Sequence, residues 1–332
     1  MTARAWPPGS TTGIGSLPGT DSVEAARLIV GEVPDLPYLA ELPGRGLGAD
    51  LIGRTGALLI DLALEWQPHG WTATAQGGSD LRQARDFLHR DLDAITEVGQ
   101  GLEVLKIQVC GPVSMGGSVE LPNLHKVLTD HGAFRDLADS LAEGVRQHVA
   151  DLQARLPGTR IVLQVDEPSL PAALAGRIPT PSGYGTVRAL PGSVAGAALS
   201  TVLAAAAEGG RVVHCCAAEP PLRLFRSAGA DAVALDASLI RAEDLDQIGE
   251  IIDDGAAVWL GVAPALDAPI TLEGTRQTVL NFWKRLGFAR SELADTVVLT
   301  PACGMAGASP GHVRRVMAVL RDTGAAIRES ED

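Results

Sequence analysis

Apolar residues gather in short continuous runs along the chain, separated by longer stretches of mixed polarity. A strand buried on both faces of a sheet gives such a run, whereas a half-buried strand alternates apolar and polar positions. The pattern therefore predicts a parallel sheet that is covered on both faces. We interpret eight runs as strands: residues 12–17, 38–42, 105–110, 160–165, 211–216, 232–236, 257–262 and 296–300.

Helical periodicity fills most of the intervals between these runs. Apolar residues recur every three or four positions over residues 134–152, as on the buried face of a long helix. Ser309 and Pro310 are typical of the N-cap and first residue of another helix. The Pro- and Gly-rich residues 169–191 are expected to form a long loop. Further helices are predicted over residues 49–64, 79–96, 239–252 and 310–320.

Eight strands alternating with helices predict one (β/α)8 TIM barrel over residues 1–332. A doubly wound open sheet is the alternative, because alternation of strands and helices does not separate the two folds. In a barrel, side chains that follow the carboxyl ends of the strands meet at one face. A functional site is therefore expected among the residues that close the apolar runs.

Composition narrows the class of protein. Apolar residues make up 46% and charged residues 20%, which excludes a disordered chain. The net charge of −13 argues against a nucleic-acid surface, which needs clustered basic residues. No apolar run reaches the roughly 18 residues of a membrane span, and residues 1–8 lack the apolar stretch of a secretory signal. We expect a cytoplasmic protein that binds neither nucleic acid nor membranes.

The most specific chemical signal is the tripeptide His214-Cys215-Cys216 at the end of a predicted strand. Side chains alternate along a strand, so His214 and Cys216 are expected on one side and Cys215 on the other. Asp236 and Cys303 close later strands and could complete a tetrahedral zinc site. The alternative is that the cysteines are buried packing residues.

The remaining cysteines and several carboxylates have simpler interpretations. Cys110, like Cys215, is expected to be a packing residue. Asp166 and Glu167 are adjacent at a strand end, so only one of them can face the site. That carboxylate could hold a substrate ammonium group or form an ion pair. Glu41 has the same two interpretations.

A set of short motifs occurs in the order found in the cobalamin-independent methionine synthase family, and the chain resembles the catalytic C-terminal barrel of that family. The motifs are residues 11–18, Gly111-Pro112-Val113, residues 164–168, His214-Cys215-Cys216, residues 233–238 and residues 301–304. The resemblance implies a single-domain methyltransferase that makes methionine from homocysteine. Uroporphyrinogen decarboxylases are similar in fold but lack this set of metal ligands.

The resemblance also implies residue roles. By this resemblance His214, Cys216 and Cys303 are zinc ligands, and Asp236 takes the place of a fourth ligand that is glutamate in the family. The resemblance also implies that homocysteine is bound by four further residues, Ile14, Ser16, Glu41 and Asp166. The expected cofactor is Zn²⁺, and the expected substrates are a homocysteine-like thiol and a methyl donor.

Two features that the family uses for a methylfolate donor do not occur here. Residues 114–117, directly after Gly111-Pro112-Val113, include no tryptophan, and residues 261–265, at the end of the run 257–262, include no histidine. That histidine supplies a proton to a poor leaving group, which a methylcorrinoid does not require. The expected donor is therefore methyltetrahydrofolate or a methylcorrinoid carried by a partner protein. The alternatives from other classes are a metal-independent, uroporphyrinogen-decarboxylase-like lyase and a non-catalytic, zinc-stabilised barrel.

Overall fold

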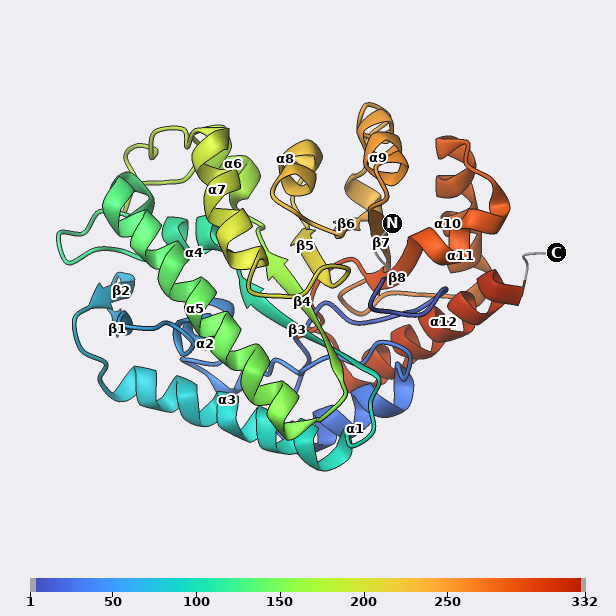
Figure 1. The fold of residues 1–332 in the computed structure, drawn as a ribbon, viewed down its shortest axis with the longest axis horizontal. Helices are drawn as coiled ribbons and strands as arrows, with labels where there is room; N and C mark the ends of the chain where they lie inside the picture. The colour runs from blue at the N-terminus through green and yellow to red at the C-terminus, as the bar shows by residue number, and fades with distance from the viewer. Residues whose placement is uncertain (1–3, 330–332) are drawn as a thin grey trace.

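The computed structural model describes residues 4–329. The ends of the predicted 1–332 domain thus lie outside the described residues. Figure 1 shows helices arranged around the outside of a curled central sheet. The helices are α1 (Ser22–Glu32), α2 (Leu51–Gly56), α3 (Ser79–Val98), α4 (Pro112–Ser118), α5 (His131–Arg155), α6 (Leu170–Leu174), α7 (Gly192–Leu203), α8 (Leu222–Ser227), α9 (Asp244–Asp253), α10 (Leu272–Leu286), α11 (Leu293–Thr296) and α12 (Pro310–Glu329).

The central sheet has six parallel strands in the order of the sequence, β3-β4-β5-β6-β7-β8. Consecutive parallel neighbours joined through helices are the expected result of repeated βαβ units. These strands agree in position with six of the predicted runs. Their bounds are β3 (Val104–Cys110), β4 (Arg160–Asp166), β5 (Arg211–Cys215), β6 (Ala232–Asp236), β7 (Ala257–Ala263) and β8 (Val297–Pro301).

The first two predicted strands, residues 12–17 and 38–42, are extended segments joined by isolated bridges instead of regular strands. Thr12 N donates to Leu299 O of β8 at 3.1 Å, and Lys106 N of β3 donates to Pro37 O at 2.8 Å. The two segments are joined by Leu17 N donating to Glu41 O at 2.9 Å. Glycine and flanking proline weaken regular strand pairing in these segments.

The predicted helix over residues 49–64 is wrong in its second half. Helix α2 ends at Gly56, and the following residues enter a two-stranded antiparallel hairpin, β1 (Ala63–Gln67) with β2 (Gly70–Thr74). Trp66 and Trp71 are paired across the hairpin, with their rings edge-to-face and 5.6 Å apart. This cross-strand contact is invisible in the helical periodicity of the leucine-rich segment.

The strands of the central sheet alternate between two buried environments. Leu105, Ile107 and Val109 of β3 pack in the large apolar core that includes the surrounding helices. Val104, one residue earlier, packs in a second core with Trp6 and with the first residues of other strands. Both faces of the sheet are therefore buried, which explains why its strands read as continuous apolar runs.

Four short 3₁₀ turns complete the described structure. They are η1 (Pro43–Arg45), η2 (Val127–Thr129), η3 (Ala237–Leu239) and η4 (Arg290–Glu292). The predicted helix over 239–252 is split, because η3 precedes α9 and an intervening turn separates them. Within residues 4–329, none of the helices combines the length and apolar character that crossing a membrane requires.

Candidate active site and metal centre

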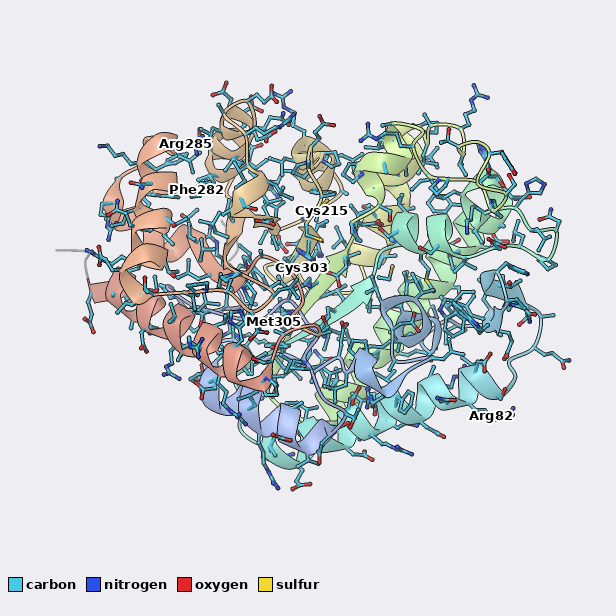
Figure 2. The ribbon with its side chains drawn as sticks, turned by 180° about the vertical axis from the view of Figure 1, so that it is seen from behind. Arg82, Cys215, Phe282, Arg285, Cys303 and Met305 are labelled. Carbon is cyan, nitrogen blue, oxygen red and sulfur yellow. The ribbon has the colours of Figure 1, made fainter. Side chains whose placement is uncertain are left out.

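The carboxyl ends of the strands surround a cavity of about 300 Å³. All the predicted site residues except Asp236 line it: Ile14, Ser16, Glu41, Asp166, His214, Cys216 and Cys303. They come from both extended segments and from the ends of β4, β5 and β8. Figure 2 shows Cys303 and Met305 near the middle of the molecule, with Arg82 and Arg285 toward its margins. The cavity is large enough for a small ligand.

His214 is held by Asp166 in the buried wall of this cavity. The two residues are neighbours in the register of β4 and β5. His214 Nδ1 lies 2.9 Å from Asp166 Oδ1. An ionised carboxylate only accepts hydrogen bonds, so Nδ1 is the protonated nitrogen. His214 Nε2 is buried and has no hydrogen-bond partner in the described residues. Its lone pair is therefore free for a ligand.

Cys216 and Cys303 bring two sulfur atoms to the same cavity. Their Sγ atoms are 3.6 Å apart and share a hydrogen bond. This hydrogen bond, together with the nearby His214, lowers the pKa of Cys303 to about 6. The same hydrogen bond and partial burial raise the pKa of Cys216. The opposite directions of these two pKa shifts favour the thiolate form of Cys303 over that of Cys216.

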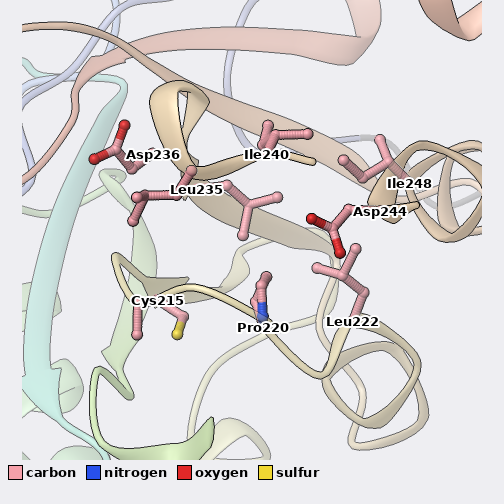
Figure 3. A pocket seen from close by; sticks show the side chains of 10 residues that line it. Cys215, Pro220, Leu222, Leu235, Asp236, Ile240, Asp244 and Ile248 are labelled. Atoms are coloured by element: carbon pink, nitrogen blue, oxygen red, sulfur yellow. The ribbon is translucent and has the colours of Figure 1, made fainter. Parts of the chain in front are cut away.

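Asp236 lies apart from this group. Its carboxylate accepts hydrogen bonds from Ser238 N at 2.8 Å and Ser238 Oγ at 2.7 Å, and so caps η3. It lines a different, much smaller pocket beside Cys215 (Figure 3). In that view the carboxylate points away from the apolar side chains of Leu222 and Ile248.

The side chains in the cavity are of the chemical types that bind zinc. Imidazole nitrogen and thiolate sulfur are common zinc ligands, and the unpartnered His214 Nε2 is the atom that would bind it. The donor set is not assembled, however. Among residues 4–329, no three His, Cys, Asp or Glu side chains converge closely enough to hold a metal ion.

Glu41 is buried beside the cavity, and its backbone bridges to Ser16. Burial raises the pKa of its carboxyl to about 7, the nearby Arg54 and Lys106 lower it, and Asp166 raises it. Oε1 has no hydrogen bond within the described residues and lies 3.9 Å from Arg54 Nε. Glu41 and Asp166 therefore form a pair of carboxylates that could bind a cationic group.

Glu167 and Cys215 face away from the cavity, as alternation along the strands requires. Glu167 is fully buried and accepts hydrogen bonds from Val113 N, Ser114 N and Ser114 Oγ, at 2.7–2.8 Å. It thereby caps the start of α4, which makes it structural. Cys215 and Cys110 are buried, as expected for packing residues.

A buried polar layer that was not predicted from the sequence is hydrogen-bonded to residues of the cavity wall, Ile14 and Asp166. Lys106 and Gln108 on β3, with Gln164 on β4, face the interior and bond to one another and to the backbone. The available signal was polar residues at alternate positions, 106 and 108, within an otherwise apolar run.

Comparison by sequence relates the chain to one enzyme family. The family model described as the catalytic domain of cobalamin-independent synthase matches residues 120–326, more than half of the chain. The match spans all four predicted zinc ligands and Asp166, and it begins downstream of Glu41. No curated protein matches the sequence.

Comparison by structure gives a consistent result. A B12-independent methionine synthase from Shewanella sp. W3-18-1, solved in complex with selenomethionine, superposes with a TM-score of 0.61 at 16% identity. The alignment covers 97% of this chain and 98% of that one. A GH5_18 protein from Streptomyces cattleya, in complex with GlcNAc, gives a TM-score of 0.47 at 14% identity, covering 100% and 82% of the two chains. The Shewanella structure shares the α/β fold.

Proposed function

The chain belongs to the cobalamin-independent synthase family through its catalytic domain, and from this premise we propose that it is a zinc-dependent methyltransferase that methylates homocysteine to methionine. The observation that carries the proposal is the cavity in which an unpartnered histidine nitrogen, two cysteines and two carboxylates meet. The family match supports an enzyme of this type, and the residues indicate which atoms would take part.

We propose that residues 1–332 form one (β/α)8 barrel. The two extended segments, 12–17 and 38–42, would take the places of its first two strands. The hydrogen bonds from β8 through these segments to β3 support this arrangement. A closed barrel would bring the site residues from six segments to one axis.

His214, Cys216 and Cys303 are the proposed zinc ligands, with Asp236 as the fourth. Asp236 would have to give up its hydrogen bonds with Ser238 in order to bind. When bound, zinc stabilises a coordinated thiol as its thiolate at neutral pH, which makes the sulfur nucleophilic. Asp166 keeps the proton of His214 on Nδ1 and so leaves Nε2 free.

The acceptor would be oriented by groups on the opposite wall. Asp166 uses Oδ1 for both of its internal hydrogen bonds, from His214 and Gln164, whereas Oδ2 makes none in the described residues. Oδ2 and the carboxylate of Glu41 would hold the ammonium group of homocysteine. Ile14 and Ser16, which line the same cavity, would bind its carboxylate end. Two contacts at one end fix the direction of the thiol.

The methyl donor is methyltetrahydrofolate or a methylcorrinoid carried by a partner protein. Among the described residues that line the cavity there is no aromatic ring and no histidine other than His214. A donor with a good leaving group requires neither ring stacking nor an acid, which supports the methylcorrinoid.

The first test is the metal content of the native chain, purified without a metal-binding tag under reducing conditions. We expect about one zinc per chain in the wild type, and loss of zinc in Cys216→Ala. Cys215→Ala is the matched control, because its thiol faces away from the cavity, and it should keep zinc. Methyl transfer to homocysteine is then measured separately with each donor.

Three results would contradict the proposal. Zinc-free wild-type protein would favour a metal-independent lyase. A Cys216→Ala variant that melts at lower temperature but binds homocysteine normally would indicate a zinc-stabilised, non-catalytic barrel. Zinc-loaded protein that transfers no methyl group from either donor would remove the assigned reaction.

A further inference from the structure

Lys106 is a buried lysine inside the curled sheet, where desolvation lowers its pKa to about 7 while the carboxylates of Asp166 and Glu41 raise it. The chain has only three lysines, and this one is 0% exposed. It lies on β3, two residues before Gln108, and both side chains face the interior. A buried charge is costly unless it is fully hydrogen-bonded, so the contacts of this ammonium require an explanation.

The three N–H groups of Lys106 have three acceptors. Nζ donates to Ile14 O at 2.8 Å, to Gln164 Oε1 at 2.8 Å and to Gln108 Oε1 at 3.1 Å. These acceptors come from an extended segment, β4 and β3. A compact ammonium donates three diverging hydrogen bonds from one nitrogen, whereas the guanidinium of arginine spreads its five donors over a single plane. The geometry therefore selects lysine at this position.

Lys106 determines which way the Gln164 amide points. An ammonium can only donate, so it accepts no hydrogen bond and must face the amide oxygen. The Gln164 NH₂ group is then directed to the other side. It donates to Asp166 Oδ1 at 2.7 Å and to Ile14 O at 2.9 Å, the oxygen that also accepts from Lys106. Donor and acceptor are thus assigned at each step by the cation.

The chain of hydrogen bonds ends at the histidine of the cavity. Gln164 and His214 bond to the same oxygen of Asp166, and this leaves the carboxylate one orientation. His214 Nδ1 is held at 2.9 Å and Nε2 faces the cavity without a partner. The path from Lys106 Nζ to His214 runs through side chains, those of Gln164 and Asp166.

We propose that Lys106 is a positioning residue for His214, acting through Gln164 and Asp166 to hold the imidazole as its Nδ1–H tautomer with Nε2 directed at the ligand. Lys106 does not touch the cavity and is not itself catalytic. The part of the inference that concerns metal affinity rests on the proposed function. The part that concerns the tautomer does not.

The first experiment measures the tautomer of His214 directly. The full chain is labelled with ¹⁵N-histidine and freed of metal with a chelator, and ring nitrogen shifts are recorded by NMR. His214 is assigned from the signal lost in His214→Asn. We expect one Nδ1–H tautomer in the wild type and a mixture of tautomers in Lys106→Met and in Gln164→Met. Lys126→Met is the control, since Lys126 pairs with Glu120 elsewhere.

The second experiment measures zinc affinity by competition with a chromophoric chelator. Outer hydrogen-bond partners of a metal ligand typically change affinity 10- to 100-fold. We expect about tenfold weaker binding in Lys106→Met and equal or greater weakening in Gln164→Met. The double variant should bind no more weakly than Gln164→Met, because the two residues act in series. A merely structural role of Lys106 would give additive losses.

The results separate failure of this inference from failure of the proposed function. A single Nδ1–H tautomer in both variants would overturn the inference, as would additive losses of zinc affinity. If the wild type binds no zinc, the proposed function fails and the tautomer alone decides the inference. If Lys106→Met does not fold, Gln164→Met still interrupts the same path and provides the test.

Discussion

Adjacent residues at the ends of β4 and β5 have opposite roles because side chains alternate along a strand. Asp166 faces the cavity and holds His214, whereas Glu167 caps α4 from the other side. Cys216 lies beside Cys303, whereas Cys215 is buried in the core. At the scale of the residue, position along the strand decides between chemistry and packing.

Glu41 should make ligand affinity depend on pH. Burial raises its pKa to about 7, against lowering by Arg54 and Lys106 and further raising by Asp166. The carboxylate that attracts an ammonium group therefore exists mainly above pH 7. We expect the affinity for norleucine, an analogue of the product methionine in which a methylene replaces the sulfur, to rise roughly tenfold between about pH 6 and pH 8, as the ionised fraction does. Isothermal titration calorimetry measures this affinity.

Glu41→Gln is the control for that titration. It should bind norleucine more weakly at high pH and show little change over the same interval. Norleucine avoids the thiol, whose own ionisation would add a second pH dependence. If norleucine affinity rose with pH as steeply in Glu41→Gln as in the wild type, a group other than Glu41 would be responsible for the pH dependence.

At the scale of the element, helix α5 is fitted closely to the segment that follows α2. A Cβ at Gly144 would overlap the backbone carbonyl of Leu58. Gly249, in the interior of α9, has open space around the same position. Glycine is otherwise unfavourable inside a helix. Close packing against Leu58 therefore requires glycine at position 144, whereas no contact requires it at position 249.

Alanine at these positions should change the free energy of unfolding in opposite directions. Gly249→Ala should stabilise the protein by about 0.5–1 kcal/mol through helix propensity. Gly144→Ala should destabilise it by about 1–3 kcal/mol, because α5 must move away from Leu58. Urea unfolding measures both changes. Stabilisation by Gly144→Ala would show that this helix contact is loose.

At the scale of the whole molecule, the interior of the curled sheet is apolar where the strands begin and carries the polar cavity where they end. The first residues of the strands enclose an apolar layer with Trp6, whose ring meets Trp259 edge-to-face at 5.2 Å. The carboxyl ends carry the cavity. The polar layer of Lys106 lies between these two ends. Stability and chemistry are thus concentrated at opposite ends of the same strands.

Truncation of Trp6 should separate stability from metal binding. Trp6 is 5% exposed, so Trp6→Ala should lower the free energy of unfolding by about 3–5 kcal/mol. Its zinc content should remain that of the wild type, because the layer lies away from the cavity. Trp66→Ala, at a side chain that is 47% exposed, should cost only about 1 kcal/mol. Loss of zinc in folded Trp6→Ala would contradict the separation.

The sequence by itself determined the features that depend on local pattern. Continuous apolar runs predicted the six strands of the sheet, and period-3.6 patterns predicted long helices such as α5 and α12. Alternation along a strand separated the side of His214 from that of Cys215. These features follow from backbone geometry over a few residues, so they can be predicted without knowing which distant segments pack against them.

Only the tertiary structure decided what depends on contacts between distant segments. Residues 63 and 64, at the end of a predicted helix, instead begin strand β1, which pairs with β2 and places Trp66 opposite Trp71. Asp236 accepts a hydrogen bond from Ser238 N at the start of η3 and so lies outside the cavity. Lys106 can be buried because three segments supply acceptors for its side-chain nitrogen. The physical reason is that burial and hydrogen-bond partners belong to the assembled molecule, while the sequence specifies only which groups are available.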